Sequence, residues 1–243
     1  MRDHPPDTEK NELKPWQKKN WCIPPEENAA FVCAMEDILE VYQRPYDPTC
    51  PLVCLDEGAK QILSEVREPQ PMKPGEPARQ DNEYKREGTC SLFMLFEPLA
   101  GQRQVLVRER RTAKDYAQVI RHLCNEMYPS AAKIVLVQDN LNVHGPHSLY
   151  AAFPPAEARR LTERIEWHYT PKHGSWLNMA EIELSALGTQ CLAERMGSRE
   201  HLASQVSAWQ AARNKEHVKA DWRFTLEQAR NKLKKLYPTI LSS

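Results

Sequence analysis

The sequence predicts a mixed α/β fold, in which helices flank a sheet that contains buried central strands. Two short runs, Leu52–Leu55 and Ile134–Val137, are continuously apolar, as is typical of strands buried on both faces. Segments with helical spacing of apolar residues follow and precede these runs. A chain of 243 residues is long enough for one large domain, or for one domain with appendages.

Turn residues and apolar spacing define the elements in the first half of the chain. Prolines interrupt the polar start, four prolines lie in residues 69–77, and Thr112 is a suitable helix cap. The expected elements are a linker (1–25), a helix that opens at 25–28 and runs to 41, a strand (52–55), an extended loop (69–77), two strands (90–96 and 104–107) joined by a turn, and a helix (112–127).

The second half of the chain is predicted to be richer in helices. Apolar residues at helical spacing predict most of its elements, and Pro238 ends the last one. The expected elements are a strand (134–137), a helix (155–164), a strand (165–169) and three helices (178–195, 198–215 and 225–236).

Composition narrows the class of protein. The formal net charge is zero, and residues 213–237 hold eight Lys or Arg against three Asp or Glu, which is also typical of the solvated face of a helix. Seven cysteines without a CxxC pair favour free thiols in a reducing compartment. No stretch approaches the roughly 20 apolar residues of a membrane span, and no signal peptide opens the chain. We therefore expect a cytoplasmic protein.

Acidic residues follow both apolar runs directly. Asp56 and Asp139 stand where strands of an α/β sheet end, which is where ligands commonly bind. The alternative is that each Asp only caps a helix or terminates a strand. Glu57 follows Asp56, and successive strand residues point to opposite faces, so only one of the two can face a shared site. Periodicity does not decide which.

A third acid, Glu181, lies in the first turn of the helix expected from residue 178. Asn178 and Glu181 also match the spacing of a capping box, in which the glutamate only stabilises the helix. Glu183 lies about 200° further around the helix and points elsewhere. Carboxylates at strand ends and on a nearby helix are typical ligands of Mg²⁺ or Mn²⁺, so we predict metal-assisted phosphoryl transfer on nucleic acid.

Several runs resemble one protein family in order and spacing. They are Val53–Glu57, Phe96–Gly101, Arg110–Thr112, Val137–Asn142 with His144, Tyr169–Glu183 and Trp222–Thr225. Together they resemble the catalytic domain of mariner-related bacterial insertion-sequence transposases, from about Leu13 to the C-terminus. This resemblance implies an RNase H-like DDE endonuclease domain (26–195) followed by a C-terminal helical extension (196–243).

The resemblance also implies the site. Asp56, Asp139 and Glu181 would be the catalytic, metal-binding acids, and Mg²⁺ or Mn²⁺ the cofactor, with two ions expected. The implied reaction is cleavage of DNA at the element ends and strand transfer into target DNA, usually at TA. The implied partner is double-stranded DNA, bound by a homodimer. Lys172 and His173 are candidate phosphate contacts, although exposed loop residues are more often only solvated.

Two alternatives remain open at this point. Family members normally begin with helix-turn-helix modules, and their absence suggests a separately encoded N-terminal half or an inactive remnant that binds DNA or dimerises. A different RNase H-like nuclease, such as a junction resolvase, would instead cut branched DNA. The HxxH pair, His144 and His147, is interrupted by Pro146, which disfavours a helical zinc site.

Overall fold

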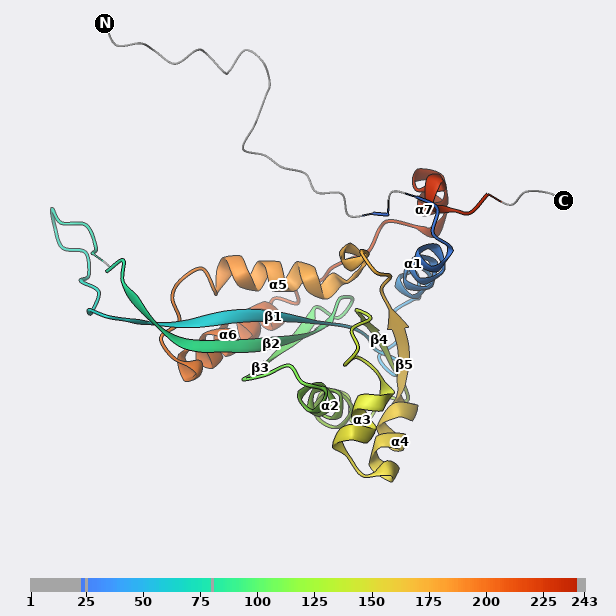
Figure 1. The fold of residues 1–243 in the computed structure, drawn as a ribbon, viewed down its shortest axis with the longest axis horizontal. Helices are drawn as coiled ribbons and strands as arrows, with labels where there is room; N and C mark the ends of the chain where they lie inside the picture. Colours follow the sequence, from blue (N-terminus) through green and yellow to red (C-terminus); the bar gives the residue numbers. More distant parts are fainter. Residues whose placement is uncertain (1–22, 25, 80, 240–243) are drawn as a thin grey trace, which may run out of the picture.

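A mixed sheet flanked by helices forms the body of the protein (Figure 1). The computed structural model describes residues 23–24, 26–79 and 81–239, so most of the predicted linker (1–25) lies outside the described residues. The elements are α1 (Ala29–Tyr42), β1 (Leu52–Glu65), β2 (Tyr84–Glu97), β3 (Gln102–Arg108), α2 (Ala113–His122), β4 (Ile134–Gln138), α3 (Pro146–Ala152), α4 (Pro155–Arg164), β5 (Ile165–Tyr169), α5 (Met179–Gln190), α6 (Arg199–Lys215) and α7 (Leu226–Lys232). A π-helical turn (Leu123–Met127) follows α2, and 3₁₀ turns lie at Ser175–Leu177 and Lys234–Leu236.

The five strands lie in the order β3-β2-β1-β4-β5. β1, β2 and β3 pair antiparallel, whereas β1 pairs parallel with β4, and β4 with β5. β1 and β4 run in the same direction, but β4 ends at Gln138, whereas β1 continues to Glu65 in its pairing with β2. The mixed α/β class predicted from the sequence is confirmed.

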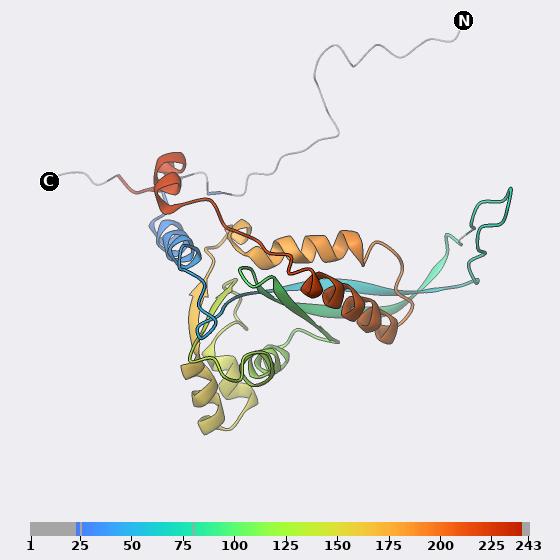
Figure 2. The same ribbon diagram turned by 180° about the vertical axis from the view of Figure 1, so that it is seen from behind.

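Helices cover both faces of the sheet and bury two separate apolar cores (Figures 1 and 2). On one face α2, α3 and α4 pack over Val53 and Leu55 of β1. On the other face α1, α5, α6 and α7 pack over Cys54. The alternation along β1 assigns each of its residues to one face, and this assignment decides the direction of the acids that follow.

β1 and β2 extend well beyond the predicted runs 52–55 and 90–96. β2 pairs with β3 only from Ser91 onward, so its earlier residues pair with β1 alone. The two strands leave the sheet as a ribbon that carries the proline-rich loop, on the left of Figure 1. An apolar-run search misses this ribbon because most of its residues are polar and at least partly exposed.

Two helices also differ from expectation. Pro146 occupies the first turn of α3, a helix of 7 residues that is too short to show a periodic pattern. α5 ends at Gln190 rather than at residue 195. The chain after α5 turns back along β1, where Leu63 N–H donates to Met196 O at 2.8 Å.

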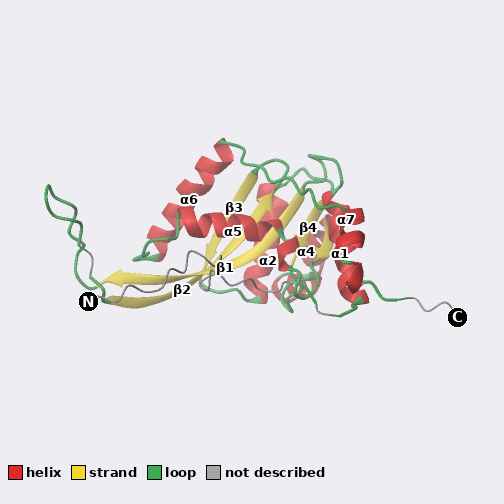
Figure 3. Cartoon of the chain, turned by 90° about the horizontal axis from the view of Figure 1, so that it is seen from above, coloured by secondary structure: helices red, strands yellow, loops and turns green. Residues whose placement is uncertain are grey.

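The C-terminal helices α6 and α7 contribute side chains to the core on one face of the sheet. Figure 3 shows these helices and the sheet from above. Asn214 of α6 pairs with the edge strand β3 as a neighbouring strand would, because it accepts from Arg103 N–H at 2.9 Å and donates to Arg103 O at 2.8 Å. Gln210 accepts from Val105 N–H at 2.9 Å. α6 thereby closes an edge that would otherwise expose unpaired backbone groups.

Within the described residues, none of the helices is long and apolar enough to span a membrane.

Candidate active site

Asp139 directly follows β4, as predicted, whereas Asp56 lies within the neighbouring parallel strand β1 and not at its end, because β1 continues in its pairing with β2. The β1–β4 register pairs Cys54 with Val137, the last pair of the ladder. Two residues further along each strand, this register brings Asp56 beside Asp139. Asp56 shares the face of Cys54 by strand alternation, and that is the face covered by α5. Glu57 therefore points to the opposite face of the sheet.

α5 brings Glu181 over this part of β1. The Asn178 side chain donates to Leu55 O at 2.8 Å, directly before Asp56. One turn beyond Glu181, Leu184 Cδ2 lies 3.3 Å from the position that a Cβ on Gly58 would occupy, directly beyond Glu57. Asn178, Glu181 and Leu184 share one helix face, since they are three residues apart. Both ends of that face contact β1, so Glu181 between them faces the strand at Asp56.

The capping-box alternative for Glu181 is not formed. The Asn178 N–H, which a capping box would direct to Glu181, donates to Ser175 O at 2.7 Å. The Asn178 side chain caps the helix by accepting from Ala180 N–H at 3.1 Å.

Glu183, two residues further along, is directed away, as predicted. Its carboxylate lies 3.0 Å from Arg103 Nε and 2.8 Å from an Arg213 nitrogen, at the junction of α5, β3 and α6. Its side chain is only 4% exposed, so these two arginines compensate a buried charge within the chain. Glu183 is therefore a structural ion-pair residue.

The charges of the neighbouring acids affect the pKa of Asp56. Burial, together with the charges of Asp139, Glu181 and Glu57, raises the pKa of Asp56 to about 7, although the Glu57 N–H that donates to its carboxylate lowers it. Asp139 and Glu181 are thus near enough to oppose ionisation of Asp56. The three acids named from the sequence therefore lie close enough to interact electrostatically.

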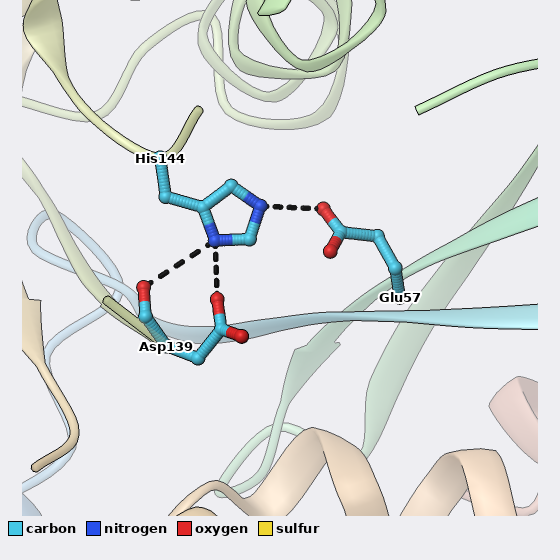
Figure 4. A group of neighbouring side chains, drawn as sticks. All are labelled: Glu57, Asp139 and His144. Atoms are coloured by element: carbon cyan, nitrogen blue, oxygen red, sulfur yellow. Dashed lines mark hydrogen bonds and ion pairs between the residues drawn. The ribbon is translucent and has the colours of Figure 1, made fainter. Parts of the chain in front are cut away.

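His144 and Glu57 form a second group of side chains, which contacts Asp139. His144, in the loop after β4, lies between two carboxylates: its Nε2 is 2.7 Å from Glu57 Oε1, and its Nδ1 contacts Asp139 Oδ1 (Figure 4). Burial lowers the pKa of His144, but the hydrogen bonds and charges of Asp139 and Glu57 outweigh it and raise the pKa to about 9. The sequence motif contained His144, but no spacing rule pairs it with Glu57, which is 87 residues away.

The two candidate phosphate contacts lie in the turn before α5. Gly174 N–H donates to Pro171 O at 2.8 Å across this turn, and Lys172 and His173 between them are exposed. His173 adopts φ 65°, in the left-handed region. His147 bonds to Asn142 O at 2.7 Å.

The acids suit a hard divalent cation. Three carboxylates offer only oxygen donors, and their mutual repulsion, visible at Asp56, is relieved when a cation binds between them. Among the described residues, the group of potential metal ligands whose donor atoms all lie within 4.8 Å of one another is Glu57, Asp139 and His144, and not the three acids. Both ring nitrogens of His144 already face carboxylates, however, which leaves no free lone pair directed at an ion.

Comparison with known families then identifies the chain. Residues 51–203, which hold all three acids, match the model of the DDE superfamily endonuclease family. The chain belongs to the DDE superfamily endonucleases. This endonuclease shares its fold with Mos1 mariner transposase structures: the paired-end complex with Mg (TM-score 0.56, 20% identity, 94% of this chain and 68% of that one) and the strand transfer complex (TM-score 0.55, 18% identity, 86% and 62%).

A third similar structure is the Mos1 paired-end complex with Mn (TM-score 0.53, 18% identity). The match covers 86% of this endonuclease and 62% of the Mos1 chain. At these identities the likeness establishes the fold, and the RNase H-like expectation is confirmed. No curated protein matches the sequence.

Proposed function

We propose that this endonuclease is the catalytic part of a mariner-related transposase, which cuts DNA at element ends and joins those ends to target DNA. One observation carries the proposal: Asp139 and Glu181 lie close enough to Asp56 for their charges to help raise its pKa, in a chain that belongs to the DDE superfamily endonucleases. The similar structures are of Mos1 in paired-end complexes, one with the left transposon end and others with Mg or Mn, and in a strand transfer complex. Their fold is the fold of this chain.

The three acids would hold Mg²⁺ or Mn²⁺, and we propose two ions. Such ions supply Lewis-acid activation of the attacking oxygen and charge stabilisation of the leaving oxygen. Asp56 would present its carboxylate from β1, Asp139 from the loop that directly follows β4, and Glu181 from α5. Lys172 and His173, exposed just before α5, are proposed to contact DNA phosphate.

The partners are proposed on the same basis. The DNA partner would be the terminal inverted repeats of an element and a target site, usually TA in the family. The chain spans 62% of a Mos1 chain, and a separately encoded helix-turn-helix half is proposed as a partner that recognises the repeats. A homodimer on DNA would hold two ends together.

A cleavage assay tests the proposal. The substrate is a duplex that carries the candidate repeats flanking the coding sequence, incubated with Mg²⁺ or Mn²⁺. We expect cuts at the repeat ends by the wild-type chain, supplied with the helix-turn-helix part where that is encoded separately, and none by Asp56→Asn. Cleavage that persists in EDTA, or only on branched DNA, would contradict it. DNA retention without any cleavage would identify the chain as an inactive remnant.

A further inference from the structure

The group formed by Glu57, His144 and Asp139 is not explained by metal binding at the three acids alone. Glu57 lies next to Asp56 in β1 but on the opposite face of the sheet, and its side chain is only 4% exposed. A buried carboxylate in this position needs a partner, and His144 is that partner at 2.7 Å. Two successive acids of β1 therefore lie near Asp139: Asp56 on one face of the sheet, and Glu57 on the other face, through its contact with His144.

The imidazole of His144 is held in a defined orientation. Its side chain is fully buried and stacks on the Tyr116 ring of α2, with ring centroids 4.8 Å apart and an angle of 26° between the planes. Tyr116 is fixed in turn, because its hydroxyl donates to Gln138 Oε1 at 2.8 Å. Gln138 is the last residue of β4 and directly precedes Asp139. The ring is thus anchored by the helix and strand that flank the site.

Asp139 is the second carboxylate that the His144 ring contacts, opposite Glu57. Nδ1 of His144 contacts Asp139 Oδ1 and lies 3.3 Å from Asp139 O, so both the side chain and the backbone of Asp139 are tied to one ring. The Asp139 side chain remains 34% exposed. One carboxylate oxygen is therefore held from within the fold, while the carboxylate is still accessible from solvent.

We propose that His144 is a positioning residue, which with Glu57 behind it fixes the Asp139 carboxylate in the orientation that binds the divalent cation. This inference rests on the proposed function, because it assumes that Asp139 is a metal ligand. Carboxylate ligands are commonly oriented by hydrogen bonds from residues that do not touch the ion, and loss of such a residue typically lowers metal affinity about 10- to 100-fold. β4 ends at Gln138, so Asp139 lacks the support of the ladder and depends on this contact.

Mn²⁺ binding to the full chain tests the proposal, with free Mn²⁺ measured by electron paramagnetic resonance. His144→Phe keeps an aromatic ring on Tyr116 but removes both nitrogens, and we expect a dissociation constant about 10- to 100-fold higher. Glu57→Gln keeps a side chain of the same size and should weaken binding in the same direction, by less. His147→Phe is the matched control, since His147 is exposed and bonds only to a loop carbonyl. It should bind Mn²⁺ as the wild type does.

Melting temperatures measured without metal separate positioning from damage to the fold. A loss of affinity in Glu57→Gln without a matching loss of stability supports the proposal, even if His144→Phe fails to fold. Unchanged affinity in Glu57→Gln and in folded His144→Phe would overturn it, while loss of binding in Asp139→Asn would leave the proposed function standing. If the wild type binds no Mn²⁺, the proposed function itself fails. If His144→Phe abolishes binding but Asp56→Asn does not, His144 is itself a ligand, which also overturns the positioning role.

Discussion

Two regions of this protein bury carboxylates in opposite electrostatic surroundings, one among cations and the other among acids. At the junction of α5, β3 and α6, Glu183 lies between Arg103 and Arg213, so its charge is compensated within the chain. On β1, beside β4, Asp56 is surrounded by the charges of Asp139, Glu181 and Glu57. The two regions are joined by one helix, since Glu181 and Glu183 are two residues apart on α5.

The comparison distinguishes buried charges that stabilise the fold through ion pairs from clustered like charges that a bound cation would stabilise. A buried ion pair is complete without any external group, and its loss mainly affects folding. A cluster of like charges is a cost to the folded protein until a cation binds, and its loss mainly affects function. The following changes test whether the two regions obey this distinction, in order from the largest expected effect to the smallest.

Asp139→Asn should have the largest effect, on cleavage. It removes a proposed metal ligand, and metal assistance contributes several kcal/mol to such reactions, so the rate should fall about 1000-fold or more. Circular dichroism should show an unchanged fold, because Asn preserves the shape of the side chain. Cleavage near the wild-type rate would remove Asp139 from the site.

Glu183→Gln and Glu181→Gln form a matched pair on α5. Glu183→Gln leaves the buried Arg103 and its neighbour Arg213 without a carboxylate, so the free energy of unfolding should fall by about 3 kcal/mol. Glu181→Gln should not destabilise the metal-free protein but should weaken Mn²⁺ binding. Urea titrations and metal titrations on both variants measure this. The reverse pattern would exchange the roles of the two acids.

Asp56→Asn should stabilise the metal-free protein above neutral pH. The folded-state pKa of Asp56, about 7, lies above the ordinary value for Asp, so its contribution to stability is present at acidic pH and is lost as the pH rises through 7. We expect a gain of about 2 kcal/mol at pH 8, roughly half of what the shift implies, since the site is partly open to solvent. Melting curves in EDTA at pH 5 and 8 measure it. An equal change at both pH values would contradict the raised pKa of Asp56, which burial and the neighbouring acids produce.

Asn214→Ala should have the smallest effect. It removes the side chain that satisfies both backbone groups of Arg103 on the edge strand, and should lower the free energy of unfolding by about 1 kcal/mol. Asn231→Ala, at an exposed position in α7, is the control and should change stability less. Equal losses in the two variants would mean that the edge contact adds nothing.

The sequence was most informative where local pattern and tertiary role coincide. Buried central strands are continuously apolar, so β4 and the start of β1 were predicted nearly to the residue, as was α4. The β1–β2 ribbon and α3 were missed, because a polar two-stranded ribbon and a helix of 7 residues carry neither an apolar run nor a period. The early end of α5 comes from contacts with β1 that no local pattern encodes.

The candidate site was predicted in part for the same reason. Asp56 and Asp139 were visible because each follows an apolar run, and Glu181 was chosen over Glu183 by family resemblance. The structure places these three acids close enough to interact electrostatically, whereas their role as metal ligands stays a prediction. Glu57 and His144 were not paired, because a contact between residues 87 positions apart depends on the parallel pairing of β1 with β4. Arg103 and Arg213 were missed as partners of Glu183 for the same reason.

The most direct test of this account is a crystal structure with Mn²⁺, in which anomalous scattering locates the ion. The account predicts a peak between Asp56 and Asp139, within coordination distance of Glu181, and none at Glu183. A peak bound by Glu57 and His144 instead, or no peak beside Asp56 and Asp139 with DNA present, would contradict the claim that Asp56, Asp139 and Glu181 are the metal site.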